Sequence, residues 1–308
     1  MKPGWTTRAI GRHLLDLPAD AKLYETYTYN KVRVEPLPAR NRRHFGAFVD
    51  LREAELKRTP SPEEIRKHSR FDLPTFLERV SHPNGSVTLV SGYDPVQEHG
   101  YLFDTYFLIG SKAVKYSGDV SHDRKESALK LRDYLAGIWR ELRPGEVPEG
   151  IGFVAGDAML ADKRFNLEDW SLSAKFAGKP IVNFVMYGFA QRVVEPGLRE
   201  RAGGAAGFLA SVLSGRSALR RRERAVGPIE GYEILMAATQ DGRRGYGFKW
   251  EAPGKAHSLA EPNLVAELTD GIHDPGGSGP PSFRDDEEAL ALWDAIIDSV
   301  RLRPGAAG

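Results

Sequence analysis

The residues that could perform acid–base or nucleophilic chemistry are scattered along the 308-residue chain. No two of the eight histidines are three or four residues apart, so no helix can present a pair of them to one metal ion. A pair that meets only through folding stays open. The sequence contains no nucleophile elbow, phosphate-binding loop, dinucleotide fingerprint, zincin motif or EF-hand loop. The histidines are His13, His44, His68, His82, His99, His122, His257 and His273.

The chain contains no cysteine, which excludes disulfide bonds, thiolate catalysis and cysteine-ligated metal centres. We therefore expect no catalytic residues, no cofactor-binding residues and no metal ligands, and so a protein that is not an enzyme. One alternative is a hydrolase whose site assembles from separated residues such as His99, Asp104 and Ser117, although nothing in their spacing favours it.

A second alternative is a binder of nucleic acid or of another anionic ligand through the basic cluster Arg220–Arg224. No aromatic residues interleave with this run, so a solvated helix face that pairs partly with Glu230 and Glu233 is the simpler interpretation. The glycine-rich segment Gly203–Gly207 lacks the spacing of a dinucleotide-binding loop, and we interpret it as a flexible helix or hinge.

Length and composition indicate a globular protein of two domains. One hydrophobic core rarely organises 308 residues, so two domains of about 150 residues are expected. The net charge of +1 gives no general attraction to nucleic acid or to anionic membranes. No run approaches the roughly 18 apolar residues of a transmembrane helix, and Met1–Asp20 lacks the apolar core of a signal peptide. From the residues alone we expect a cytoplasmic protein, unless a leader precedes Met1.

The C-terminal segment Asp285–Gly305 repeats the pattern of Asp123–Gly145, about half a chain earlier. Each segment has an acidic start, an Ala-Leu-x-Leu-x-Asp core with one following or overlapping Trp, and a Leu-Arg-Pro-Gly end. This spacing predicts two tandem units, each closed by an amphipathic helix, with a linker at Pro144–Gly150 where proline and glycine interrupt helical structure. We place the domains at residues 1–147 and 148–308.

Local patterns predict mainly strands within each unit. Ser61-Pro62-Glu63-Glu64 predicts a helix start with a capping box. Further helical segments are expected near Asp123–Leu142, at about Glu195–Arg224 and in the closing segment, and His273–Ser282 is expected to be a loop. Runs of strands with few crossover helices predict an α+β fold, in which each domain is a mainly antiparallel sheet packed by helices. The expected strands are Gly11–Pro18, Tyr24–Val34, Ser86–Ser91, Tyr101–Ile109, Lys112–Tyr116, Ile151–Val154, Trp170–Phe176, Ile181–Tyr187, Tyr232–Thr239, Tyr246–Glu251 and Leu264–Thr269.

Several segments together resemble a known family, the two-domain immunity proteins that guard bacteria against type VI secretion lipase effectors. The most specific part is Phe248-Lys249-Trp250-Glu251 followed by the closing Ala-Leu-x-Leu-Trp-Asp helix. One departure is Gly152-Phe153-Val154, where members of the family often have Gly-Phe-Cys. The matching pieces span nearly the whole chain in the order of the family: Gly11–Pro18, Gly150–Leu160, Leu219–Leu235, Tyr246–Gly254 and Ala289–Pro304.

The resemblance implies a non-enzymatic antitoxin of bacterial competition, which binds a cognate phospholipase effector and clamps it between two lobes. It also implies a periplasmic location, and neither nucleic acid nor a transmembrane segment is expected. Because the matching motifs are strands and helices that form the fold, no effector-contact residue is carried over, and the partner-binding residues stay unassigned. We expect them on the loops between these elements.

Overall fold

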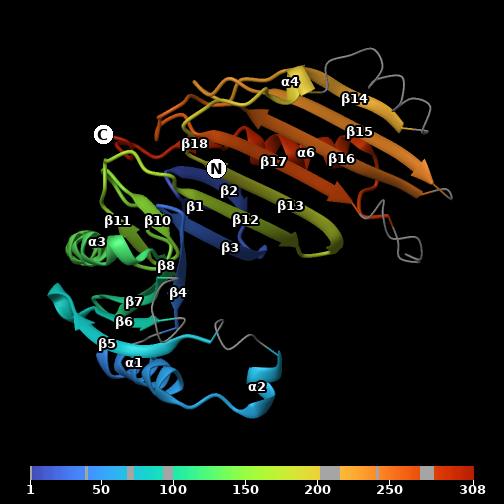
Figure 1. The fold of residues 1–308 in the computed structure, drawn as a ribbon. Helices are drawn as coiled ribbons and strands as arrows, with labels where there is room; N and C mark the ends of the chain where they lie inside the picture. The colour runs from blue at the N-terminus through green and yellow to red at the C-terminus, as the bar shows by residue number, and fades with distance from the viewer. Residues whose placement is uncertain are drawn as a thin grey trace. The chain divides into compact units, whose positions relative to one another are not determined.

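The computed structural model describes residues 2–38, 41–67, 73–92, 100–201, 216–240, 243–270 and 281–308. Contacts divide the chain into two compact units, each assembled from separate stretches of sequence (Figure 1). Every helix within the described ranges is too short or too polar to cross a lipid bilayer. Unit 1 comprises Met1–Thr26, Gly145–Ile151 and Lys163–Gly308, and unit 2 comprises Tyr27–Pro144 and Gly152–Asp162.

Unit 2 is built on antiparallel strands in the order β3-β4-β8-β7-β6-β5. Helices cover both faces, since Val49 of α1 shares a core cluster with Leu89, whereas Leu129 of α3 packs with the cluster of Val90. Adjacent strand residues point to opposite faces, so Leu89 and Val90 join different helices. The elements are β3 (Lys22–Tyr29, in this unit from Tyr27), β4 (Val32–Leu37), α1 (Arg42–Lys57), α2 (Pro62–Lys67), β5 (Thr75–Ser81), β6 (Val87–Gly92), β7 (Tyr101–Ile109), β8 (Lys112–Val120) and α3 (Lys125–Ile138), with the 3-10 turns η2 (Pro83–Gly85) and η3 (His122–Arg124).

Unit 1 repeats this topology, with the strand order β12-β13-β17-β16-β15-β14. Its core lies between the sheet and helix α6, where the Trp293 ring centroid is 5.8 Å from that of Phe248 and 6.4 Å from that of Phe184. The capping carboxylate of Asp285 accepts from the backbone N–H of Glu288 and fixes the start of this helix. The elements are β12 (Asp169–Phe176), β13 (Lys179–Phe189), α4 (Leu198–Arg201), β14 (Arg216–Glu223), β15 (Tyr232–Gln240), β16 (Arg243–Ala252), β17 (Asn263–Asp270) and α6 (Asp286–Ile297).

Each unit also contains a small three-stranded sheet, made of a hairpin and one short strand. In unit 1 the hairpin β1–β2 pairs through β2 with β18, so the second strand of the chain lies beside the last one (Figure 1). In unit 2 the hairpin β10–β11 pairs with β9. The strands are β1 (Trp5–Ile10), β2 (His13–Pro18), β9 (Trp139–Glu141), β10 (Phe153–Ala155), β11 (Ala158–Leu160) and β18 (Arg301–Leu302).

The order of elements therefore repeats along the chain, from β1 to β9 and again from β10 to β18, but the two hairpins are exchanged. The hairpin that begins each repeat pairs with the strand that ends the other repeat. The compact units differ for this reason from the division at residues 1–147 and 148–308, which stays a prediction. The predicted α+β class with mainly antiparallel sheets is confirmed.

Three segment predictions were wrong in part. The single strand expected at Tyr24–Val34 is a hairpin of β3 and β4, because Asn30 and Lys31 adopt positive φ angles of 53° and 64° and turn the chain. The helix expected to run to Leu142 ends at Ile138, since Trp139–Glu141 pairs with β11 instead. The helical stretch expected up to Arg224 is, over Arg216–Glu223, strand β14 paired with β15.

Other features were found as predicted or were not foreseen. The capping box is present, with Ser61 Oγ accepting from the Glu64 backbone N–H and Glu64 accepting from the Ser61 backbone N–H. Tyr246, Phe248 and Trp250 of β16 share one buried face, since side chains two residues apart on a strand point to the same side of the sheet. The sequence reasoning did not anticipate helix α1. Gly203–Gly207 lies outside the described residues, as does most of the predicted loop His273–Ser282.

Candidate functional site

Of the separated residues considered for a hydrolase, the structure describes Asp104 and Ser117, and these two interact with one another. Asp104 and Ser117 are cross-strand neighbours, and the Ser117 hydroxyl donates to the Asp104 carboxylate. The other carboxylate oxygen accepts from Arg52 Nε at 2.7 Å, and Lys115 Nζ lies 3.3 Å from the oxygen that Ser117 binds. Burial raises the pKa of Asp104, but the hydrogen bonds from Ser117 and Arg52 outweigh it and hold the pKa below its usual value. Asp104 is thus a stably charged structural acceptor, and His99 lies outside the described residues.

A histidine chain that the sequence reasoning missed has the order of a catalytic triad. His82 Nδ1 lies 2.7 Å from an Asp133 carboxylate oxygen, and His82 Nε2 lies 2.6 Å from Thr88 Oγ1. The chain continues to Thr105, which accepts from Arg132 Nε at 2.7 Å. Thr88 and Thr105 are both completely buried, so no substrate reaches the hydroxyl that would attack. The chain therefore joins helix α3 to strands β6 and β7 and serves the fold of unit 2.

The basic cluster Arg220–Arg224 forms ion pairs within unit 1. Arg224 Nη1 donates to Glu233 at 2.6 Å, and Arg222 Nε donates to the other oxygen of the same fully buried carboxylate at 2.8 Å. Arg220 reaches Asp294 at 2.7 Å, and Arg224 also reaches Asp298, the residue that caps the C-terminal end of α6. Three of the four arginines of the cluster meet three carboxylates here and tie β14 and β15 to α6. The fourth, Arg221, donates to the Tyr232 hydroxyl at 3.1 Å. The expected pairing with Glu233 is present.

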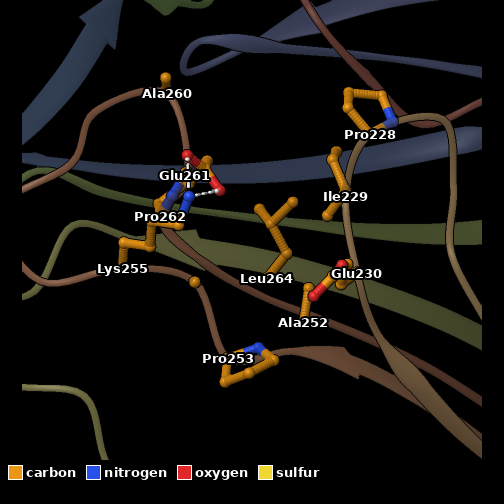
Figure 2. A pocket seen from close by; sticks show the side chains of 11 residues that line it. Pro228, Ile229, Glu230, Ala252, Pro253, Lys255, Ala260, Glu261, Pro262 and Leu264 are labelled. Atoms are coloured by element: carbon orange, nitrogen blue, oxygen red, sulfur yellow. Dashed lines mark hydrogen bonds and ion pairs between the residues drawn. The ribbon is translucent and has the colours of Figure 1, made fainter. Parts of the chain in front are cut away.

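A hollow in the described part of unit 1 lies at the end of the sheet, between the β14–β15 loop (residues 224–231) and the β16–β17 loop (residues 253–262). We call it the loop pocket, and Figure 2 shows its lining side chains. Its volume is about 230 Å³. Its wall is largely apolar and its rim is charged. The wall residues are Pro228, Ile229, Ala252, Pro253, Gly254, Ala260, Pro262 and Leu264, and the rim residues are Glu230, Lys255 and Glu261.

Hydrogen bonds within the loops hold the wall of this pocket in place. The Lys255 backbone N–H donates to the Glu261 carbonyl at 2.8 Å, and the two side chains form an ion pair at 2.8 Å. Gln191 holds the same loop through two hydrogen bonds. Its side-chain Nε2 donates to the Pro253 carbonyl at 2.6 Å, and its backbone carbonyl accepts from the His257 backbone N–H at 2.8 Å. The loop pocket is therefore a preformed feature of unit 1.

The sequence reasoning placed contact residues on loops but named none, and so it missed this pocket. The local signal was modest: Pro253-Gly254 and Pro262 bracket a polar stretch between two predicted strands. The convergence of this loop with Pro228–Glu230 depends on the pairing of β15 with β16 and could not be read from spacing. A second pocket of about 220 Å³ lies in unit 2, with Lys112 and Asp157 ion-paired at 3.0 Å. No cluster of three potential metal ligands occurs in the described ranges.

Comparisons with known proteins identify relatives of the whole chain. Residues 146–305 match the family model described as the Tle cognate immunity protein 4 C-terminal domain. The solved apo structure of TplEi, an immunity protein of the type VI secretion system from Pseudomonas aeruginosa, is 34% identical, with 99% of each chain covered and a TM-score of 0.85. No curated protein matches the chain.

Two further structures capture relatives with a bound partner. The Tle4–Tli4 complex contains a chain that is 34% identical, with 99% of this chain and 100% of that chain covered and a TM-score of 0.85. TplEi from Pseudomonas aeruginosa bound to a peptide designated "L" is 33% identical, with the same coverage and a TM-score of 0.82. Because 99% of this chain is covered in each comparison, the likeness extends over both units. The chain therefore belongs to the Tle cognate immunity protein 4 family of the type VI secretion system.

Proposed function

We propose that this protein is a non-enzymatic immunity protein, which binds a cognate type VI secretion lipase effector and inhibits it. The observation that carries the proposal is the full-length similarity to Tli4, a relative captured in complex with Tle4. The internal chemistry supports a binding role, because the histidine chain and the arginine cluster are both committed to the fold. Inhibition would then depend on occlusion of the effector surface.

A tight inhibitor of this kind needs a substantial interface, on the order of 1,600 Å² in total. The chain offers two compact units on which such an area can be built. That the effector is clamped between two lobes stays a prediction. We also propose a periplasmic site of action, supported by the membership of a family named for immunity to Tle effectors. Cell fractionation with periplasmic and cytoplasmic marker proteins would test the location.

The test is reconstitution with the lipase encoded beside this gene. The purified pair should co-elute from a size-exclusion column at micromolar concentration, and lipase activity should fall in proportion to the immunity protein added. Cells that express the lipase should survive when they also express this protein. An unrelated bacterial lipase serves as the control and should keep its activity. Failure of the cognate pair to associate at micromolar concentration would overturn the proposal.

A further inference from the structure

The two repeats of the chain provide an internal comparison for the loops around the loop pocket. Strands β7 and β8 of unit 2 are joined by a turn of two residues, Gly110-Ser111, whereas their counterparts β16 and β17 are joined by residues 253–262. Strands β5 and β6 are joined by residues 82–86, and their counterparts β14 and β15 by residues 224–231. The sheet topology thus needs only short turns at this end, and the longer loops of unit 1 are additions to it.

In unit 2 the corresponding turns are closed by single polar side chains, Glu141 of β9 and Asn84 of the β5–β6 turn. Glu141 accepts from the backbone N–H of Ser111 at 3.0 Å and seals the short β7–β8 turn. The Asn84 side chain donates to the carbonyls of Leu108 and Ala136 and closes the β5–β6 turn. In unit 1 the longer loops instead enclose the loop pocket, and the hydrogen bond from Gln191 to Pro253 holds its wall in place. A braced cavity on added loops is the arrangement expected of a preorganised recognition site.

The surroundings of the loop pocket define what it can receive. Ile229 and Leu264 line its base and three prolines its sides, which suits an apolar side chain (Figure 2). At the rim, Lys255 is held by Glu261, so the exposed carboxylate of Glu230 leaves the rim with one net negative charge. This charge is complementary to a basic group beside the apolar one.

An exposed apolar segment extends the same surface. Val193 is 74% exposed and Val194 is 42% exposed. Their loop lies against the pocket wall, because Gln191 bonds to Pro253 and a Cβ placed on Gly197 would lie 3.5 Å from Pro253 Cβ. Neighbouring apolar contacts around a central pocket are typical of the anchor region of a protein interface.

We infer that the loop pocket is an effector-anchoring site, which receives an apolar side chain of the lipase effector that stands next to a lysine or arginine. This inference rests on the proposed function and assigns the partner chemistry to one place in unit 1. The apolar side chain lies against Ile229 and Leu264, and the basic side chain pairs with Glu230. Val193 and Val194 contact the effector beside the anchor.

The first test fills the pocket. Ala260→Trp places an indole in the cavity, and Ala256→Trp is the matched control, since Ala256 is exposed on the same loop and does not line the pocket. Binding to the purified cognate lipase, measured by calorimetry or interferometry, should weaken about 30-fold for Ala260→Trp, which is the loss expected at a central anchor. The control should stay within about threefold of the wild type.

The second test reverses the rim charge and does not depend on how the tryptophan variant folds. Glu230→Lys should weaken binding about fivefold at low salt, and the effect should shrink as salt rises, because the charges at the rim are screened. Glu287→Lys is the control, since Glu287 is exposed at the opposite end of the same sheet, next to the Asp286 that pairs with Arg244 of β16.

The outcomes separate this inference from the proposed function. If the wild type binds the lipase and both pocket variants bind as their controls do, the anchoring site is wrong and the proposed function stands. If the wild type does not bind the lipase, the proposed function fails and the anchoring site fails with it. If the isolated protein dimerises with rising concentration and Ala260→Trp abolishes this, the pocket receives a second copy of the chain and the inference is overturned.

Discussion

At the scale of single residues, His13 is a titratable side chain buried in a site that favours its neutral form. It is 1% exposed, and neither ring nitrogen has a hydrogen-bond partner in the described part of the chain. Its ring centroid lies 6.1 Å from that of Trp170. Burial, followed by the charges of Arg12 and Arg303, lowers the pKa of His13 to about 4. The unfolded chain takes up this proton near pH 6.5 and the folded chain does so only near pH 4.

Stability should therefore fall as the pH is lowered from about 6.5 towards 4, because the unfolded state binds the proton first. The lowered pKa corresponds to a loss of about 3 kcal/mol across this window, at about 1.4 kcal/mol per pH unit. His13→Leu should remove this part of the pH dependence, as measured by urea unfolding at pH 7, 5.5 and 4.5. His44→Leu, at an exposed position on α1, should keep the wild-type slope. Equal slopes in His13→Leu and the wild type would refute this account of His13.

Residue contacts differ in how far the sequence can predict them. The Ser61–Glu64 capping box was predictable, because both partners lie within one helical turn. The partners of Arg224 were only partly predictable: Glu233 is nine residues away, but Asp294 is 70 residues away. The loop pocket belongs to the second kind, since its walls come from two loops that meet only after β15 and β16 pair.

At the scale of elements, the β3–β4 hairpin illustrates a turn that the sequence signals weakly. Dense Tyr, Thr and Val favour strand on both sides, and the turn pair is Asn30-Lys31, in which the second residue is an unusual choice for a positive φ angle. Asn tolerates the left-handed region better than most residues, whereas a lysine there is strained by its Cβ. The strand pattern was therefore predictable, and its interruption was not.

Lys31→Gly should relieve this strain and stabilise the protein by up to about 1 kcal/mol, since Asn-Gly is the preferred pair for such a turn. The midpoint of thermal or urea unfolding measures the change. Lys175→Gly is a matched control, because Lys175 is an exposed residue of β12 without a positive φ angle. There the same replacement should destabilise the protein by about 0.5–1 kcal/mol. A loss of stability in Lys31→Gly would show that Lys31 is not strained.

The short strands β9 and β18 follow the two helices of the repeated pattern, and they show where local periodicity stops predicting structure. Both segments contain an amphipathic run and a Leu-Arg-Pro-Gly end, so their helices were predictable from local periodicity. Trp139 continues the apolar pattern of α3 but forms β9, because the chain here pairs with β11, where Trp139 lies opposite Leu160 and the Ala161 N–H donates to the Ile138 carbonyl at 3.0 Å. Tertiary pairing overrides the local preference at this helix end.

At the scale of the whole molecule, the exchanged hairpins connect the two repeats more firmly than a linker would. Hairpin β1–β2 contributes Ile10 and Leu17, both fully buried, to unit 1. Arg12 Nε donates to Glu168 at 2.6 Å in a buried ion pair. Gly11 packs directly against the Trp170 indole, so that a Cβ at this position would lie only 2.3 Å from the ring. A repeat was predictable from the echo of the two helices, but the exchange was not, because no local pattern records which strand a hairpin will join.

A fragment of residues 148–308 should therefore not fold cooperatively by itself, although it contains most of the region matched by the family model. It lacks β1–β2, and without Arg12 the buried carboxylate of Glu168 loses its ion pair, a change that costs about 3–5 kcal/mol. Adding a peptide of residues 1–26 in trans should restore a cooperative thermal transition and quench or shift the fluorescence of Trp170. A scrambled peptide of the same composition is the control. A fragment that melts cooperatively without the peptide would contradict the importance of the exchange.

The pairing of β2 with β18 also constrains how the chain matures during translation. Asp16 donates its backbone N–H to the Ser299 hydroxyl across 283 residues of sequence. At about 5–20 residues per second, the ribosome delivers that partner roughly 15 to 60 seconds after Asp16 has been made. Throughout this interval the edge of β2 that pairs with β18 has no partner strand. We therefore expect the nascent chain to bind chaperones. A chain that is truncated before β18 leaves β2 without its partner strand.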